Sequence, residues 1–177
     1  GLIVGVTLYL SPSVVIKRNS EIVREGGVRE IRFETTDTKS LETSIPFLKA
    51  NNLDYSEILP ISDPGVKKIV GVTIFIMMTV VVVMLLSNGV NLTDGVDGLA
   101  SGSSAIVGVV LGVFAYVSSH HDMAGYLNTM FIPGAEELVI FAATLVGATA
   151  GFLWYNSYPA QVFMGDTGSL ALGGIIG

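Results

Sequence analysis

The stretch Asn88–Ser101, NGVNLTDGVDGLAS, places Asp94 and Asp97 in a glycine-rich segment between two long apolar runs. No lysine or arginine lies nearby to neutralise these two carboxylates. A second stretch, Asn156–Ser169, reads NSYPAQVFMGDTGS, carries Asp166 and also stands between apolar runs. Apolar runs of this length predict membrane spans, so both stretches are expected at a membrane surface. We expect them to share a divalent cation and a phosphorylated substrate.

The composition and the distribution of charge indicate an integral membrane protein. Half of the 177 residues are hydrophobic and 14% are charged, whereas soluble domains carry roughly 25% charged residues. All nine lysines and arginines lie between Lys17 and Lys68, and Ile69–Gly177 has none. A basic face for nucleic acid is therefore absent. The chain has no cysteine, which excludes disulfides within it.

Three uncharged runs are long enough to cross a bilayer. The shortest have 18 residues, which at 1.5 Å per residue nearly cover the hydrocarbon core of about 30 Å. One run contains several glycines and serines, which allow close helix packing in membranes. Another ends in Trp154-Tyr155, an aromatic pair typical of a membrane interface. We predict spans at residues 66–87, 99–119 and 138–155 and from 169 onward, with loops at 88–98 and 156–168.

The remaining residues complete the predicted organisation. Residues 1–16 are uncharged and predict the end of a membrane helix, and residues 17–65 form one polar insert. The chain starts and ends inside apolar runs, so we expect an interior fragment of a longer protein. Within the insert, Arg29–Asp37 alternates like a strand, and residues 45–60 could form a short interfacial helix. The predicted class is an all-α polytopic membrane protein with about three complete transmembrane helices, partial spans at both ends and one extramembrane insert.

Counting the spans assigns each loop to a side of the membrane. If each run crosses once, loops 88–98 and 156–168 share one side, whereas the polar insert shares the other side with residues 120–137. Asp94, Asp97 and Asp166 then lie on the same face. The cluster His120-His121-Asp122 could suggest a metal site, but it falls on the opposite face. We therefore interpret it as a polar turn.

The two loops have the chemistry of a magnesium and phosphate site. Mg²⁺ is commonly held by one or two carboxylates, waters and substrate phosphates, and helix N-termini attract anions. Four loop glycines allow close approach of a ligand: Gly95, Gly98, Gly165 and Gly168. Asp94 and Asp166 could also be simple turn residues. Other structural roles remain open: Asp97 could cap the following helix, Ser169 or Thr167 the last one, and Asn88 and Asn91 the end of the first.

From the residues alone, two classes of function stand against each other. An enzyme acting on a phosphorylated lipid or nucleotide places its acids at the interface, whereas an ion-coupled transporter places acids near the middle of its spans. All three aspartates stand at span ends, and the three uncharged runs contain no acid. This placement favours the enzyme.

Three stretches of the sequence indicate a more specific function: NGVNLTDGVDGLA, FLWYNSYPAQVFMGDTGSLALGG and AGYLNTMFIPGAEELVIF. They closely resemble the phospho-N-acetylmuramoyl-pentapeptide-transferase (translocase I) family of the polyprenyl-phosphate hexose-1-phosphate transferase superfamily. The resemblance covers most of Ile69–Gly177, in order. It implies a ten-helix, multi-pass enzyme of the bacterial inner membrane. The implied reaction transfers phospho-MurNAc-pentapeptide from UDP-MurNAc-pentapeptide to undecaprenyl phosphate, giving lipid I and UMP.

The resemblance also implies roles for individual residues. Asp166 resembles the family's Mg²⁺ ligand, and Asp94 and Asp97 resemble the acidic residues of its nucleotide-sugar site, with Asn91 beside them. These three aspartates are the candidate catalytic residues. The residues that resemble its uridine pocket are Gly95, Val96, Asn156 and Phe163, of which Phe163 would stack on the base. Asp97 is counted with the substrate-binding residues as well.

Membrane orientation and completeness follow from the same resemblance. It places both loops in the cytoplasm and the insert in the periplasm, whereas the lysines and arginines of the insert would favour a cytoplasmic insert. We follow the resemblance, because the nucleotide substrate is cytoplasmic. The family's paired-aspartate motif would lie before Gly1 and its histidine-rich loop after Gly177, so the chain is expected to be inactive alone. A transferase using UDP-GlcNAc, and a scaffold or transporter, remain alternatives, and the uncharged helices leave room for a homodimer.

Overall fold

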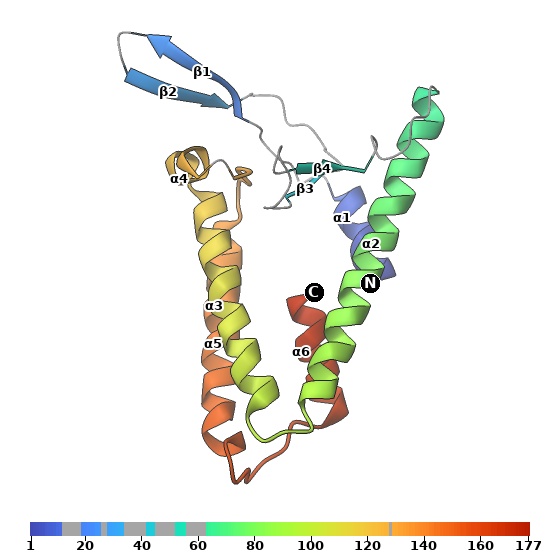
Figure 1. The fold of residues 1–177 in the computed structure, drawn as a ribbon, viewed down its shortest axis with the longest axis vertical. Helices are drawn as coiled ribbons and strands as arrows, with labels where there is room; N and C mark the ends of the chain where they lie inside the picture. The colour runs from blue at the N-terminus through green and yellow to red at the C-terminus, as the bar shows by residue number, and fades with distance from the viewer. Residues whose placement is uncertain (12–18, 26–27, 34–41, 45–51, 56–62, 128) are drawn as a thin grey trace.

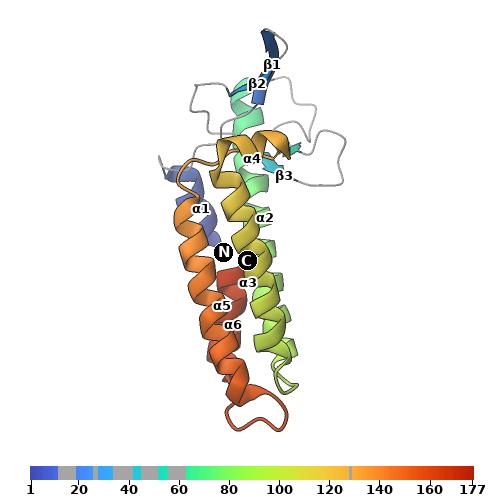
Figure 2. The same cartoon turned by 90° about the vertical axis from the view of Figure 1, so that its left-hand side faces the viewer.

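The computed structural model describes residues 1–11, 19–25, 28–33, 42–44, 52–55, 63–127 and 129–177. Within these ranges the long helices run side by side, and the short strands lie at one end of the group, where the helix of residues 64–93 extends past the others (Figure 1). A view turned by 90° shows the strands at the same end (Figure 2). The helices are α1 (Leu2–Leu10), α2 (Pro64–Thr93), α3 (Leu99–Ser119), α4 (His121–Tyr126), α5 (Glu136–Asn156) and α6 (Gly165–Ile176). The strands are β1 (Asn19–Glu25), β2 (Val28–Phe33), β3 (Glu42–Ser44) and β4 (Asn52–Asp54).

Three of these helices are long and apolar enough to cross a membrane: α2 from Gly65, α3 and α5. They confirm the predicted class, an all-α membrane protein with about three complete transmembrane helices. α1 and α6 are shorter, with 9 and 12 residues. They lie where the partial spans are expected.

Helix α2 extends past the predicted end of its span. It begins at Pro64, whose ring suits the first turn, and the Asp63 carboxylate caps it by accepting from the Gly65 N–H at 2.9 Å. It continues to Thr93 rather than ending near residue 87. The Asn88 side chain donates to the Met84 carbonyl at 2.8 Å, one turn back along the helix. Both Asn88 and Asn91 therefore lie on α2, and the loop itself spans residues 94–98.

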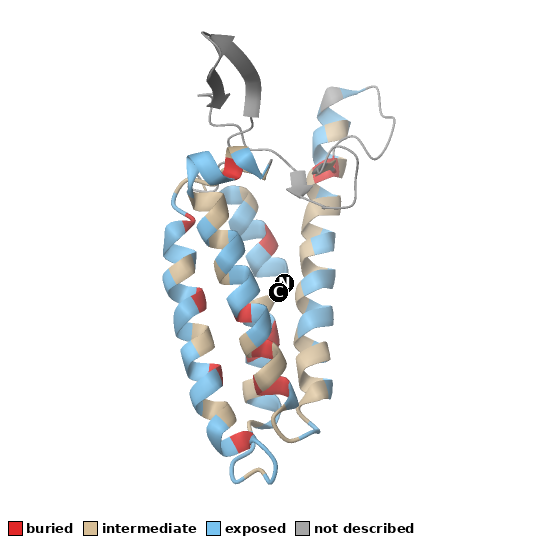
Figure 3. Cartoon of the chain, turned by 60° about the vertical axis from the view of Figure 1, so that its left-hand side comes forward, coloured by how far each residue is buried: buried red, intermediate tan, exposed pale blue. Residues whose placement is uncertain are grey.

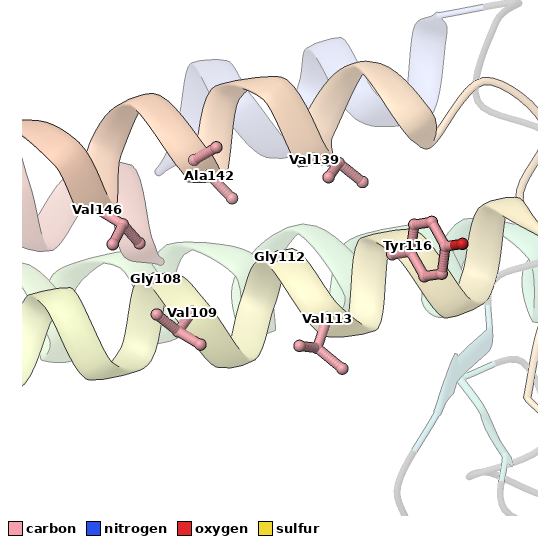
Figure 4. Close-up of a pocket in the computed structure, with 9 residues that line it drawn as sticks. Gly108, Val109, Gly112, Val113, Tyr116, Val139, Ala142 and Val146 are labelled. Carbon is pink, nitrogen blue, oxygen red and sulfur yellow. The ribbon is translucent and has the colours of Figure 1, made fainter.

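Helices α3 and α5 pack along each other through small residues (Figure 4). A Cβ added at Gly108 would lie 2.9 Å from Val146 Cγ2, and one at Gly112 would lie 3.3 Å from Ala142 Cβ. Glycine at these two positions permits the close approach. A shallow groove without charged residues runs along the pair, lined by Gly108, Val109, Gly112, Val113, Tyr116, Val139, Ala142, Ala143 and Val146.

A second group consists of α2 with α1 and α6 (Figure 1). A Cβ added at Gly173 would lie 2.5 Å from the Leu86 carbonyl oxygen and 2.6 Å from Ser87 Cα, so the backbones of α6 and α2 are almost in contact. The Ser87 hydroxyl donates to the Leu170 carbonyl at 2.8 Å. This contact determines where the beginning of α6 lies relative to the end of α2.

Most of the large apolar residues that the structure describes are exposed, and exposed residues recur along the long helices (Figure 3). Ile69, Ile106 and Ile140 are each about two-thirds exposed. Exposed apolar surface on this scale is unfavourable in water and suits a lipid environment. The buried residues of the helices are mostly small or polar, among them Ala100, Ser101, Ser104, Thr149, Asn156 and Ser169.

The described part of the polar insert contains two antiparallel pairs of strands. β1 pairs with β2, from Asn19 opposite Phe33 to Glu25 opposite Val28, and β3 pairs with β4. The predicted strand is confirmed over residues 29–33, and residues 34–37 lie outside the described part. The interfacial helix is wrong at residues 52–54, which form a strand, and the rest of that prediction, except Tyr55, lies outside the described residues. Tyr55 is buried with its ring edge-on to Phe75 of α2, at 5.9 Å between centroids.

Candidate active-site loops

The two acidic loops lie at the same end of the helices. Residues 94–98 join α2 to α3, and residues 157–164 join α5 to α6, both at the lower end in Figure 1. Helix α4, which begins at His121, lies at the opposite end. The structure therefore brings the two loops together, as parity predicts, and keeps the histidines away from them.

The first loop is a tight turn that directs the chain from α2 into α3. The Asp94 N–H donates to the Val90 and Asn91 carbonyls at 3.1 and 3.3 Å, which ends α2. Gly98 has φ of +75°, a conformation that favours glycine, and begins α3 without a side-chain cap. The suggestion that Asp97 caps α3 is therefore wrong. Asp97 is directed to the other loop instead.

Asp97 connects the two loops. Its Oδ2 accepts a hydrogen bond from the backbone N–H of Ala160 at 3.0 Å, across 63 positions of sequence. Because the Ala160 N–H is bound by a carboxylate, the middle of the second loop is fixed against the end of the first.

Asn156, the last residue of α5, makes the second connection. Its side-chain Oδ1 accepts from the Gly98 N–H at 3.1 Å and from the Ser101 hydroxyl at 3.0 Å, and its Nδ2 donates to the Val162 carbonyl at 2.9 Å. The residue is only 4% exposed. Its amide therefore bonds to the start of α3 on one side and to the second loop on the other.

A third connection joins the start of α6 to the end of α2. The Ser169 hydroxyl donates to Asn91 Oδ1 at 2.6 Å and is fully buried. Helix α6 begins at Gly165, where φ is +70°, rather than after residue 168. Ser169 and Thr167 thus lie inside the helix, and the suggestion that either caps it is wrong.

The other predicted site residues remain accessible at this end. Asp166 is exposed in the first turn of α6, and Asp94 is half-buried at the end of α2. Gly95 is exposed, and so are Val96 and Phe163, with exposed fractions of 60% and 69%. These five residues are available to a ligand, whereas Asn156 is not exposed.

The residues present suit a metal that arrives with a substrate. In the part of the chain that the structure describes, no group of three or more acidic or histidine side chains gathers closely enough to hold a metal ion. Mg²⁺ commonly needs only one or two protein carboxylates, because waters and phosphate oxygens complete its ligands. An exposed Asp166 and a half-buried Asp94 provide oxygen donors of this kind.

The sequence interpretation missed Ser101. This serine lies in the quoted loop string, but its partner is 55 positions away, so its spacing from the aspartates gave no sign of a role. One signal was present. Ser101, Ser104 and Gly108 recur at helical spacing and predict the face of α3 that packs on another helix.

The long apolar helices cross a membrane, and acidic, glycine and aromatic residues lie together at one end of them. These features place the protein in the class of multi-pass membrane proteins with a polar site at the membrane surface. Comparison with known families gives the particular family. The chain belongs to glycosyl transferase family 4, whose sequence profile matches residues 43–177.

Several similar curated proteins carry the name phospho-N-acetylmuramoyl-pentapeptide-transferase. The chain is 62% identical to the protein of that name from Porphyromonas gingivalis (strain W83), 58% to that of Parabacteroides distasonis and 56% to that of Bacteroides fragilis (strain NCTC 9343). Each comparison covers 99% of this chain. The chain spans 42% of the length of these relatives.

Proposed function

We propose that the protein transfers phospho-MurNAc-pentapeptide from UDP-MurNAc-pentapeptide to undecaprenyl phosphate, giving lipid I and UMP. The observation that carries this proposal is the identity of up to 62%, over nearly the whole chain, with relatives named for that transfer. The arrangement of the loops supports it. A site at the end of membrane helices suits a reaction between a soluble nucleotide and a lipid.

The proposed roles divide among the residues at the two loops. Asp166 holds Mg²⁺, and Asp94 and Asp97 act in the nucleotide-sugar site beside Asn91. Gly95, Val96 and Phe163 receive the uridine, with the exposed Phe163 ring stacking on the base. Asn156 belongs to the same pocket.

Phosphoryl transfer depends mainly on positioning and electrostatic stabilisation. Mg²⁺, when bound, would neutralise charge on the diphosphate. The chain itself supplies the first turn of α6, where unpaired N–H groups attract an anion. The bonds between Asp97 and Ala160 and between Asn156 and Val162 keep the loops at fixed positions, so little reorganisation accompanies substrate binding.

The proposed location is the bacterial inner membrane, with both loops in the cytoplasm and the polar insert in the periplasm. The three apolar helices support insertion in a membrane. The orientation rests on the cytoplasmic origin of the nucleotide. The uncharged faces of the helices are compatible with a homodimer.

The direct test is to identify the product made by the purified full-length protein. The protein in detergent is given undecaprenyl phosphate and Mg²⁺, with UDP-MurNAc-pentapeptide or UDP-GlcNAc in separate reactions, and the lipid fraction is analysed by mass spectrometry. The proposal predicts lipid I from the first nucleotide alone. A lipid-linked GlcNAc product only would assign the protein to the related reaction. No lipid product from either nucleotide, with folded protein, would favour a scaffold or transporter.

A further inference from the structure

Four hydrogen bonds hold the two loops and the adjoining ends of α3 and α5 together, and we call them the loop clamp. They are the bonds of Asn156 to Gly98, Ser101 and Val162, and the bond of Asp97 to Ala160. One of the Asn156 bonds is to the Val162 carbonyl, and Val162 directly precedes the exposed Phe163. The clamp thus connects the proposed base-stacking residue to the loop that carries the two aspartates.

The orientation of the Asn156 amide is determined by its partners. The Gly98 backbone N–H can only donate, so the atom facing it must be Oδ1. The Val162 carbonyl can only accept, so the atom facing it must be Nδ2. The Ser101 hydroxyl lies 3.0 Å from Oδ1 and 3.4 Å from the Gly98 carbonyl oxygen, and its shorter hydrogen bond is the one that it donates to Oδ1. The partners thus identify Oδ1 as the acceptor and Nδ2 as the donor of the amide.

Ser101 differs from its neighbour on the same face of α3. Ser101 is fully buried, and its hydroxyl bonds to Asn156. Ser104, one turn along α3, is 1% exposed, and its hydroxyl has no hydrogen-bond partner among the described residues. Burying a hydroxyl is costly unless it is hydrogen-bonded. The Ser101 hydroxyl is hydrogen-bonded, because it donates to Asn156 Oδ1, and this bond also helps to hold the Asn156 amide in place.

We propose that Ser101 and Asn156 are positioning residues, which hold the α5–α6 loop and its Phe163 against the α2–α3 loop so that the two loops form one nucleotide site. This inference rests on the proposed function. It gives Asn156 an indirect role, because its amide already bonds within the protein and its side chain is buried. Ser101 acts through Asn156.

The first test removes single atoms from the clamp in the full-length protein. Ser101→Ala deletes one of the two donors to Asn156 Oδ1. Because one hydrogen bond makes a modest net contribution, we expect the KM for UDP-MurNAc-pentapeptide to rise about three- to tenfold, with kcat within about twofold. Asn156→Asp keeps the size and the acceptor but replaces the donor facing Val162 with an oxygen. We expect a larger rise, about tenfold or more.

Ser104→Ala is the matched control. It removes the same atom at the same depth, one turn away on the same helix, without removing a bond of the clamp. We expect its KM and kcat to equal those of the unaltered protein. Equal KM values for Ser101→Ala and the unaltered protein would overturn the inference. Equal defects in the Ser101 and Ser104 variants would also overturn it, since that result indicates general weakening of the α3–α5 contact.

A second readout separates this inference from the proposed function. Amide hydrogen exchange of residues 157–164, followed by mass spectrometry, reports the loop without any substrate. We expect faster exchange there in Ser101→Ala and Asn156→Asp than in Ser104→Ala, because weaker Asn156 bonds hold the loop less firmly against the start of α3, so the bond from the Ala160 N–H to Asp97 opens more often. If the unaltered protein makes no lipid product, the proposed function is refuted. The hydrogen-exchange measurement still tests the loop clamp, because it needs no substrate. Unchanged exchange in both clamp variants would refute the clamp.

Discussion

At the scale of single residues, the site separates into side chains that are available and side chains that are already bonded. Asp166 and Phe163 are exposed, whereas Asn156 and Ser169 are buried and bonded between elements. Exposed residues can be altered with little effect on folding, because surface changes away from structural features typically shift stability by no more than about 0.5 kcal/mol. Substitutions at Asp166 and Phe163 therefore test chemistry rather than stability.

Replacing Asp166 by asparagine removes the proposed metal ligand. We expect UMP release to fall about a hundredfold or more, because charge stabilisation at the reacting phosphate is lost. Thermal unfolding should stay unchanged. Asp122→Asn is a matched control, since Asp122 is an exposed carboxylate in the first turn of α4 at the opposite end. Near-normal turnover in the Asp166 variant, over a range of Mg²⁺ concentrations, would refute its assignment.

Replacing Phe163 by alanine tests the proposed stacking on uracil. Stacking of one base on an aromatic ring is worth about 1–3 kcal/mol. We therefore expect UMP to bind at least about fivefold more weakly, as measured by calorimetry. Tyr126→Ala is the control, because Tyr126 is an exposed aromatic residue at the other end. Equal affinity in the two variants would exclude a stacking role for Phe163.

At the scale of elements, the contact between α2 and α6 determines where the start of α6, which carries Asp166, lies in the site. Gly173 lies almost against the α2 backbone, and Ser169, one turn earlier, bonds to Asn91. Backbone atoms cannot move aside as a flexible side chain can. The start of α6, with Asp166, is therefore expected to follow any shift in this contact.

Gly173→Ala should force α6 away from α2. We expect a loss of about 1–3 kcal/mol in the free energy of unfolding, the usual effect of overpacking. Thermal unfolding in detergent measures the change. Gly174→Ala is the matched control, since a Cβ there meets nothing within 4 Å. A Gly173 variant as stable as the Gly174 variant would contradict the close contact.

The sequence predicted the elements better than their ends. Uncharged runs revealed the three spans, and counting them placed the two loops at one end. The end of α2 was missed because Asn88 and Gly89 are typical of turns, yet the Asn88 side chain bonds within the helix. The bond between Asn156 and Ser101 could not be predicted, because it depends on how α3 and α5 are aligned along each other.

At the scale of the whole molecule, the proposed orientation conflicts with the distribution of lysine and arginine. Every basic residue lies between Lys17 and Lys68, on the side assigned to the periplasm. Polar segments of this length follow the positive-inside rule less strictly. The orientation is therefore open to a direct labelling test.

Because the chain has no cysteine, single cysteines can report the orientation. In full-length protein without other cysteines, we place one at Asp122 and one at Tyr158, both of which are exposed. A maleimide that cannot cross the inner membrane should label position 122 in intact cells and position 158 only after the membrane is opened. The reverse pattern would place the acidic loops outside the cytoplasm and exclude a cytoplasmic nucleotide as their substrate.

The central claim is that the two loops form one nucleotide site at one end of the helices. The most direct measurement is amide hydrogen exchange of the full-length protein with and without UMP and Mg²⁺. We predict slower exchange with the ligand in residues 94–98 and 157–164 together, and no change in α4 or residues 129–135. Protection in one loop alone, or at the α4 end, would contradict a single site shared by the two loops.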